Sequence, residues 1–197
     1  MNQPDASAPS TLIVLAHPDL AHSRINAPLA AGVADVPGAT VRHLDALYPD
    51  GAIDVEAEQR ALEAADTIVL QYPTYWYSTP GLLKTWLDTV LLRGWAYGSS
   101  APGVLKGKGL RVVTSTGGIE AAYSPEGFHG WEIDDVLIPL KAIARRLGMR
   151  WLEPLVVHGV RDVTPDELDG YVDDYRRMLH AEPAALALSP LSALSAA

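Results

Sequence analysis

The chain has 197 residues, of which 48% are hydrophobic, and its formal net charge at pH 7 is −9. This length and composition are sufficient for one domain with a complete core. The acidic balance argues against nucleic-acid binding, which needs clustered Lys and Arg to neutralise phosphates. Because the sequence contains no cysteine, disulfides, thiolate metal sites and cysteine nucleophiles are excluded.

No stretch of the sequence approaches the roughly 18 consecutive apolar residues that a membrane-spanning helix needs. Residues 1–10 are polar and lack the basic-then-apolar pattern of a secretion signal. We therefore expect a cytoplasmic protein without membrane insertion. Residues 1–10 are predicted to form a flexible segment and residues 11–182 a single domain. Residues 183–197 carry no charge and are predicted to be a flexible tail or a short appended helix.

Five apolar segments alternate with helical patterns along the chain. The predicted strands are Thr11–Ala16, Thr40–Leu44, Thr67–Tyr72, Leu110–Thr114 and Trp151–His158. The predicted helices are Arg24–Val36, Val55–Ala65, Pro80–Leu92, Asp134–Leu147 and Pro165–Ala181. This alternation predicts an α/β protein with a five-stranded parallel sheet, strand order 2-1-3-4-5, and helices on both faces.

Two helix boundaries carry specific signals. Thr164 followed by Pro165 and two acidic residues is typical of an N-cap and the first helical turn. Gly148 follows two arginines and predicts a helix C-cap with basic residues at the negative end of the helix dipole.

In this architecture ligands bind beyond the carboxyl ends of strands one, three and four. The first of these loops, residues 17–26, lacks the glycine patterns of dinucleotide and P-loop sites. Ser23 is a natural N-cap, and the free amides of the first helical turn can bind a phosphate. Arg24 and His17 are candidates to add charge or hydrogen bonds. An ordinary capped helix with no ligand is the alternative.

The second loop, residues 73–77, follows a predicted buried strand and contains Tyr75, Trp76 and Tyr77 between two prolines. Aromatic rings offer a large contact area at little entropic cost, and prolines fix the loop before a ligand binds. This pattern favours a platform for a flat, conjugated ligand. A core-packing or dimer-contact cluster is the alternative.

The third loop ends the fourth predicted strand with Ser115-Thr116-Gly117-Gly118, where paired glycines allow close backbone approach to a ligand. Beyond it, Tyr123 and His129 lie six residues apart on a loop rich in Gly and Pro. A phenol can hold developing negative charge, and an imidazole can deliver a proton near neutral pH. A solvated loop without a role is the alternative.

A resemblance to a family of zinc enzymes begins at the first predicted strand. Residues 14–19 resemble the opening of zinc-dependent deacetylases of the N-acetylglucosaminyl-phosphatidylinositol type, which carry His-Pro-Asp-Asp. Here Leu20 stands where the second Asp belongs, and no later His-x-x-His completes a ligand set. This hypothesis, which predicts a bound metal, is therefore disfavoured, and no metal site is expected.

Taken together, the segments resemble the NAD(P)H:quinone oxidoreductases of the flavodoxin-like superfamily, from about Thr11 to Ala181. This group includes ancillary oxidoreductases of glutathione-regulated potassium efflux and quinone reductases of the modulator-of-drug-activity type. The motifs that carry the resemblance are Ala16-His17-Pro18, Ser23–Asn26, Tyr72-Pro73-x-x-Trp76-Tyr77-x-x-Pro80-x-x-x-Lys84-x-Trp86, Gly94-Trp95-Ala96-Tyr97-Gly98, Thr116-Gly117-Gly118 and the Tyr123/His129 pair.

The resemblance implies a flavodoxin-like three-layer sandwich with a flavin held by the three loops. FMN is favoured over FAD, which remains possible, because the first loop is short and no long C-terminal domain follows. The residues expected to contact the flavin are His17, Ser23, Arg24, Ile25, Asn26, Pro73, Thr74, Tyr75, Trp76, Tyr77, Ser115, Thr116, Gly117, Gly118 and Tyr123.

The resemblance also implies a reaction: hydride transfer from NAD(P)H through the flavin to a quinone or similar acceptor, in a ping-pong cycle through one pocket. Tyr123 and His129 would steady charge beside the flavin. Trp76, Tyr77 and His129 would line the substrate pocket with Tyr97, which could come from a partner subunit. Family members are usually homodimers, and the helix that carries Lys84 and Trp86 is expected to help build the dimer.

Two further hypotheses stay open at this point. The first is a regulatory ancillary subunit that associates peripherally with a potassium efflux transporter and uses flavin secondarily. The second is a flavodoxin-like electron carrier. It is disfavoured because a carrier has no need of the Tyr123/His129 pair.

Overall fold

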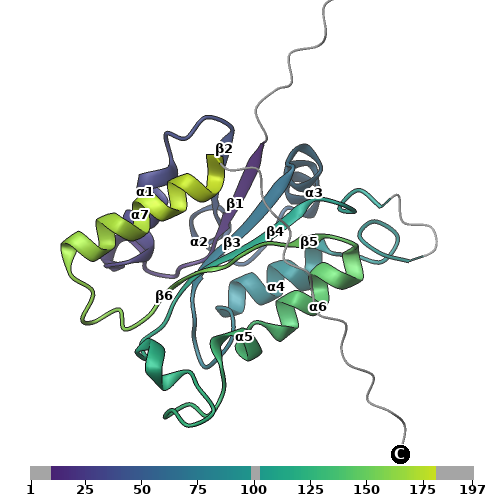
Figure 1. Ribbon diagram of the computed structural model, residues 1–197. Coiled ribbons are helices and arrows are strands. Elements are labelled where there is room, and N and C mark those ends of the chain that lie inside the picture. The colour runs from purple at the N-terminus through teal and green to yellow at the C-terminus, as the bar shows by residue number, and fades with distance from the viewer. Residues whose placement is uncertain (1–9, 99–102, 181–197) are drawn as a thin grey trace, which may run out of the picture.

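The computed structural model describes residues 10–98 and 103–180 (Figure 1). Its strands are β1 (Thr11–Leu15), β2 (Ala39–His43), β3 (Thr67–Pro73), β4 (Gly109–Ser115), β5 (Arg150–Trp151) and β6 (Leu155–Val157). Its α-helices are α1 (Asn26–Val33), α2 (Leu44–Leu47), α3 (Val55–Ala64), α4 (Gly81–Val90), α5 (Ile133–Val136), α6 (Ile138–Leu147) and α7 (Pro165–His180). Two 3₁₀ turns are η1 (Leu20–His22) and η2 (Glu120–Ala122).

The strands form one parallel sheet in the order β2-β1-β3-β4-β5, with β6 also paired to β4. The predicted fold class and strand order are therefore confirmed. The predicted fifth strand, Trp151–His158, is divided into β5 and β6. Pro154 lies in the interruption and has no N–H to donate to a ladder. The carbonyl of Glu153 accepts instead from the guanidinium of Arg111 at 2.7 Å.

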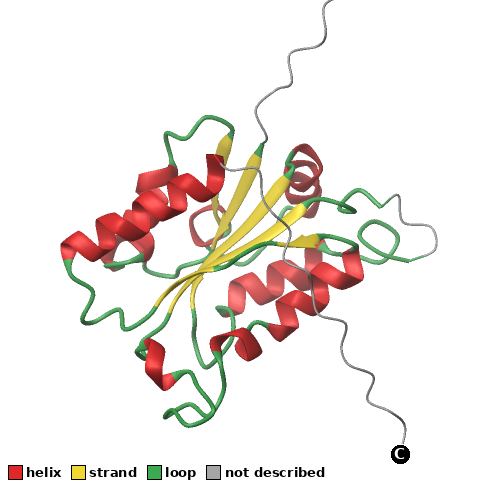
Figure 2. Cartoon of the chain, in the orientation of Figure 1, coloured by secondary structure: helices red, strands yellow, loops and turns green. Residues whose placement is uncertain are grey.

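The sheet separates two hydrophobic cores. Figure 2 shows α1 and α7 on one face and α3, α4 and α6 on the other. Side chains of β1 alternate between them: Leu12 and Val14 pack in the core beneath α3, α4 and α6, whereas Ile13 packs beneath α1 and α7. All residues of β1, β3 and β4 are buried. This explains why these strands read as near-continuous apolar runs.

Several boundaries differ from those predicted. The predicted helix 134–147 is two helices, α5 and α6, and Pro139 lies in the first turn of α6. Proline is tolerated in a first turn but disfavours a continuous helix through the preceding turn. The short α2 was not predicted. Gly148 is a left-handed C-cap with φ 69°, as expected. Thr164 and Glu167 exchange hydrogen bonds as a capping box.

The predicted flexible N-terminal segment and the predicted tail at residues 183–197 lie almost entirely outside the described residues. Within the part that the structure describes, no helix is both long and apolar enough to cross a membrane.

Close packing of α1 against α7 generates a stability prediction. A Cβ on Gly32 in α1 would collide with Cγ1 of Val172 in α7, whereas a Cβ on Gly170, also in α7, would meet nothing within 4 Å. We expect Gly32→Ala to lower the free energy of unfolding by about 1–3 kcal/mol through overpacking. The matched Gly170→Ala should raise it by about 0.5–1 kcal/mol, since alanine favours helix interiors. Denaturant unfolding measures both, and equal effects would contradict the packing argument.

Candidate functional site

The three loops predicted to hold a ligand meet at the carboxyl edge of the sheet. Nδ2 of Asn26 in the first loop donates to Oγ of Ser115 at the end of β4, at 3.0 Å. The backbone N–H of Thr74, after β3, donates to the carbonyl of Ser115 at 2.8 Å. The hydroxyl of Tyr77 is 3.1 Å from Nδ1 of His129. These contacts bring the aromatic turn, the glycine turn and the start of α1 into one site.

A buried polar bracket fixes the start of α1. Nε2 of Gln71 on β3 donates to the carbonyl of Asn26 at 2.9 Å, and Oε1 of Gln71 accepts from the hydroxyl of Tyr175 on α7 at 3.3 Å. Gln71, Asn26 and Tyr175 are all fully or almost fully buried. Oδ1 of Asn26 is buried without a hydrogen-bond partner. A buried oxygen of this kind is typically satisfied by an ordered water.

The first loop presents free backbone donors. Oγ of Ser23 accepts from the N–H of Asn26 at 3.0 Å. This is the capping bond that was predicted, although α1 begins at Asn26 and Ile25 directly precedes it. Among the described residues, the structure records no acceptor for the N–H groups of Arg24 and Ile25. Free amides at the positive end of a helix dipole form an anion site.

The side chain of Arg24 bonds to a distant segment of the chain instead of adding its charge to this anion site. Its guanidinium donates to the carbonyls of Val160, Arg161 and Val163 at 2.9–3.3 Å. These carbonyls belong to the segment that leads into α7. The guanidinium therefore ties the first loop to α7, and the backbone amide is the part of Arg24 that is available to a ligand.

His17 is buried at the end of β1 and is anchored on three sides. The backbone N–H of His17 donates to Oδ2 of Asp45 at 2.8 Å, and its backbone carbonyl accepts from Nε2 of His43 at 3.0 Å. Nδ1 of His17 accepts from the N–H of Asp19 at 3.1 Å, so Nε2 carries the proton of the neutral ring. Burial lowers the pKa of His17, and the Asp45 carboxylate opposes this shift. The ring is therefore oriented as a neutral donor.

The aromatic turn is a strained two-residue hairpin. Tyr75 and Ser78 exchange backbone hydrogen bonds at 3.0 Å, and between them Trp76 and Tyr77 adopt φ values of 49° and 61°. Positive φ at both central positions is usual for such hairpins, but glycine or asparagine normally occupies them. Trp76 is 93% exposed. The strained turn thus leaves the large ring of Trp76 exposed to solvent. Backbone strain of this kind is common at functional sites.

The two glycines of the third loop serve different purposes. A Cβ on Gly118 would lie 2.5 Å from Nε2 of His129 and 3.2 Å from Cε2 of Tyr123, so these rings pack directly on the glycine. A Cβ on Gly117 would meet nothing within 4 Å. Gly117 therefore leaves its backbone open to close approach by a ligand.

Tyr123 and His129 stack beside the glycine turn. Their ring centroids are 4.3 Å apart with an interplanar angle of 30°, and Tyr77 meets the His129 ring edge-on at 5.5 Å. Burial raises the pKa of Tyr123, and a hydrogen bond with Thr116 acts in the opposite direction. The phenol is therefore a neutral donor at neutral pH. The predicted juxtaposition of Tyr123 and His129 is realised, and Tyr77 joins it.

His158 belongs to the same cluster and was not predicted as a site residue. Its ring centroid is 5.3 Å from that of Tyr123, and its Nδ1 is 3.0 Å from Oγ1 of Thr116. The sequence held a usable signal, because His158 ends the predicted fifth strand at the same carboxyl edge as the three loops. Gln71 and Asp45 were also missed. Gln71 was taken for part of an apolar strand, and Asp45 lies in the unpredicted α2.

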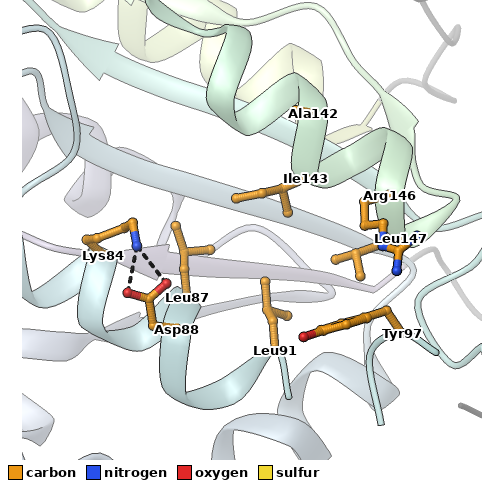
Figure 3. Close-up of a pocket in the computed structure, with 9 residues that line it drawn as sticks. All are labelled: Lys84, Leu87, Asp88, Leu91, Tyr97, Ala142, Ile143, Arg146 and Leu147. Atoms are coloured by element: carbon orange, nitrogen blue, oxygen red, sulfur yellow. Dashed lines mark hydrogen bonds and ion pairs between the residues drawn. The ribbon is translucent and has the colours of Figure 1, made fainter. Parts of the chain in front are cut away.

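Tyr97 does not join the other predicted pocket residues within one chain. It lies in a groove between α4 and α6, where the guanidinium of Arg146 sits 5.2 Å from its ring centroid (Figure 3). The groove has a volume of about 440 Å³ and is floored by Leu87, Leu91 and Ile143. The groove lining does not include Trp76, Tyr77 or His129, the other residues predicted to line the substrate pocket.

The zinc hypothesis finds no ligand set in the part of the chain that the structure describes. Within residues 10–98 and 103–180, no group of three or more His, Asp or Glu side chains is arranged to hold a metal ion.

Comparison with known proteins identifies the family. The model of proteins with a flavodoxin-like fold matches residues 9–179. A curated relative is the glutathione-regulated potassium-efflux system ancillary protein KefF of Enterobacter sp. (strain 638), which is 40% identical over 168 residues. The match covers 85% of this chain and 94% of the relative.

Solved structures agree in fold. General stress protein 14 of Treponema denticola, in complex with FMN, is 37% identical with a TM-score of 0.83 and covers 87% of this chain and 98% of its own. An NADPH-quinone reductase of P. pentosaceus is 33% identical with a TM-score of 0.79 and covers 86% and 97%. A protein named thermophilic tryptophan halogenase, from Streptomycin violaceusniger, is 42% identical with a TM-score of 0.82 and covers 84% and 96%.

The names of the three solved structures differ, whereas their fold and the extent of their match to this chain are similar. On the match over residues 9–179, the chain belongs to the family of proteins with a flavodoxin-like fold.

Proposed function

We propose that this protein is a flavin-dependent NAD(P)H oxidoreductase that passes two electrons through bound FMN to a quinone or similar conjugated acceptor. The observation that carries the proposal is the convergence of three features at one sheet edge: an anion site, an open glycine backbone and a Tyr–His ring pair. The FMN bound in the Treponema denticola relative and the NADPH-quinone reductase named among the solved structures support it.

The described residues fit an FMN molecule. The amides of Arg24 and Ile25, with the hydroxyl of Ser23 and the donor Nε2 of His17, suit its phosphate. The backbone of Gly117 is open to the edge of a flat ring system. FAD would also fit this donor set at its FMN half.

Bound flavin would supply the hydride chemistry, and the protein would supply orientation and electrostatics. The neutral Tyr123 phenol can donate a hydrogen bond to negative charge that develops at the polar edge of the ring. His129, whose Nδ1 is paired with the hydroxyl of Tyr77, can hold or release a proton beside it. Exposed Trp76 and half-exposed Tyr77 are suited to cover a flat substrate. One such slot would serve NAD(P)H and acceptor in turn, in a ping-pong cycle.

We also propose a homodimer. Tyr97 lines the groove between α4 and α6. A smaller neighbouring cavity of about 70 Å³ is lined by Thr74 and Ser78, next to the aromatic turn. Both cavities share Lys84, Leu87 and Ile143 in their linings. A two-fold pairing of this face would therefore bring Tyr97 of one copy to the aromatic turn of the other.

A second candidate function follows from the KefF relative, whose name describes an ancillary protein of a potassium-efflux system. On this hypothesis the protein binds such a transporter peripherally and flavin chemistry is secondary. Co-purification with the transporter of the same organism would support it. Full reductase activity without any transporter would favour the oxidoreductase alone.

The first test is flavin loading. Purified protein, or protein reconstituted with FMN, should show the absorption bands of an oxidised flavin and lose them when NADPH is added without oxygen. Gly117→Val should weaken FMN binding by about tenfold or more, a loss of about 1.4 kcal/mol for each factor of ten. Thermal unfolding of the ligand-free variant should be unchanged, because the added Cβ has no neighbour. A colourless protein that cannot be reconstituted would contradict the proposal.

The second test concerns His129. His129→Ala should retain FMN but slow its reduction by NAD(P)H by about 10- to 1000-fold, the range expected for a proton-handling group. Rapid-mixing absorbance under anaerobic conditions measures the rate, and Phe128→Ala, which truncates the neighbouring exposed ring, is the control. An unchanged rate in His129→Ala would rule out this role.

The third test concerns the dimer. Sedimentation should give twice the chain mass of 21.1 kDa. Leu91→Lys, which places a charge in the groove, should shift the protein toward monomer, whereas Leu92→Lys, at an exposed position outside the groove lining, should not. A wild-type monomer at micromolar concentration would refute the dimer without affecting the flavin proposal.

A further inference from the structure

The backbone of His17 lies just beyond the last ladder bond of β1. In a parallel sheet both backbone polar groups of a residue face the same neighbouring strand, and successive residues alternate between the two neighbours. The N–H of Ala16 donates to the carbonyl of Gln71 on β3 at 3.0 Å, so both groups of His17 face the side of β2. There β2 has ended at His43 and the chain turns into α2. The strand that would pair with His17 is therefore missing.

Two side chains take the place of this strand. Oδ2 of Asp45 accepts from the backbone N–H of His17 at 2.8 Å, and Nε2 of His43 is 3.0 Å from the His17 carbonyl. Because a carbonyl can only accept, Nε2 of His43 is the donor. The side chains of His43 and Asp45 are 24% and 19% exposed, so both bonds are partly shielded from water. We call this pair, Asp45 and His43, the His17 clamp.

The ring of the clamped residue keeps one nitrogen for a ligand. Nδ1 of His17 accepts from the N–H of Asp19 at 3.1 Å, so the neutral ring carries its proton on Nε2. Within residues 10–98 and 103–180 the structure records no partner for this Nε2, although His17 is only 9% exposed. The same loop contains the free amides of Arg24 and Ile25. A buried donor in a loop of this kind suits an anion.

The carboxylate of Asp45 has the same charge sign as the anion that this loop is suited to bind, and its field reaches the His17 ring. The carboxylate of Asp19 is 65% exposed, and its Oδ1 lies 2.7 Å from Nδ1 of His22. By charge alone, Asp45 would weaken the binding of an anion at His17. By holding His17 in position, it would strengthen that binding. The two effects have opposite signs, so removal of the carboxylate separates them.

We propose that Asp45 and His43 are positioning residues for the anion site: by holding both backbone groups of His17, they fix its ring so that Nε2–H is presented to a phosphate. The inference rests on the proposed function, in which His17 binds the phosphate of FMN. It adds two residues that act only through His17. Asp45 serves through its acceptor oxygen, and its charge opposes the ligand.

The test compares the affinities for FMN and for riboflavin, which lacks the phosphate. Asp45→Ala removes the acceptor and the charge together. We expect it to weaken FMN binding about tenfold and to change riboflavin binding by less than about twofold. Asp45→Asn removes the charge but keeps an acceptor oxygen, so its FMN binding should equal that of the wild type or be tighter.

Flavin fluorescence measures both affinities. Asp50→Ala, which removes an exposed carboxylate beyond α2, is the matched control and should leave both affinities unchanged. FMN binding that is unchanged or tighter in Asp45→Ala would overturn the proposal. Equal weakening in Asp45→Ala and Asp45→Asn, or equal weakening of FMN and riboflavin, would overturn it as well.

A second variant covers the case in which Asp45→Ala does not fold. His43→Phe keeps a ring but removes the donor to the His17 carbonyl. It should weaken FMN binding about three- to tenfold and leave riboflavin binding unchanged. Unchanged FMN binding in His43→Phe would then overturn the proposal.

Nitrogen-15 nuclear magnetic resonance of the histidine rings separates this proposal from the proposed function. In ligand-free wild type and in Asp45→Asn, His17 should be protonated predominantly at Nε2, whereas in Asp45→Ala the two neutral forms should mix. His17→Gln assigns the signal among the six histidines. Wild-type protein that binds neither flavin would refute the proposed function. The ring forms would still decide the role of the clamp, and identical His17 spectra in wild type and Asp45→Ala would overturn it.

Discussion

The site depends on one buried constraint, the hydrogen-bonded set of Gln71, Asn26 and Ser115. It joins the middle of β3, the first residue of α1 and the last residue of β4, so the three loops above them have fixed relative positions. Buried polar groups of this kind are tolerated only when nearly every donor and acceptor is satisfied. Among the buried side-chain atoms of residues 10–98 and 103–180, only Oδ1 of Asn26 has no hydrogen-bond partner.

The strained turn at Trp76 and Tyr77 persists because the segments around it are fixed in position. Positive φ at two residues with large side chains costs free energy that flexible loops would release by rearranging. The turn is held by the reciprocal bonds of Tyr75 and Ser78 and by the side-chain bond between Thr74 and Thr114. The backbone of the turn is therefore pre-organised, which lowers the ordering entropy that would be lost when a flat molecule binds.

The sequence predicted the features that arise from local periodicity and position. Buried parallel strands read as apolar runs, and their order placed the loops 17–26, 73–77 and 115–118 at one edge before any contact was known. The sequence did not predict hydrogen bonds between polar side chains that are far apart in the chain. Gln71 looked like part of a strand, although its amide bonds to groups 45 and 104 residues away. The location of Tyr97 likewise depends on contacts with no local pattern.

Helix α7 contributes no side chain to the rim of the site, yet it is joined to the site at two points. Tyr175 bonds to Gln71, and the carbonyls that lead into α7 accept from Arg24. A molecule that orders the first loop would therefore also favour the docked state of α7, and by reciprocity a loosened α7 would weaken binding at the start of α1. Helix α7 would then be coupled to binding at the first loop, and slower amide exchange in α7 would report a ligand that α7 does not contact.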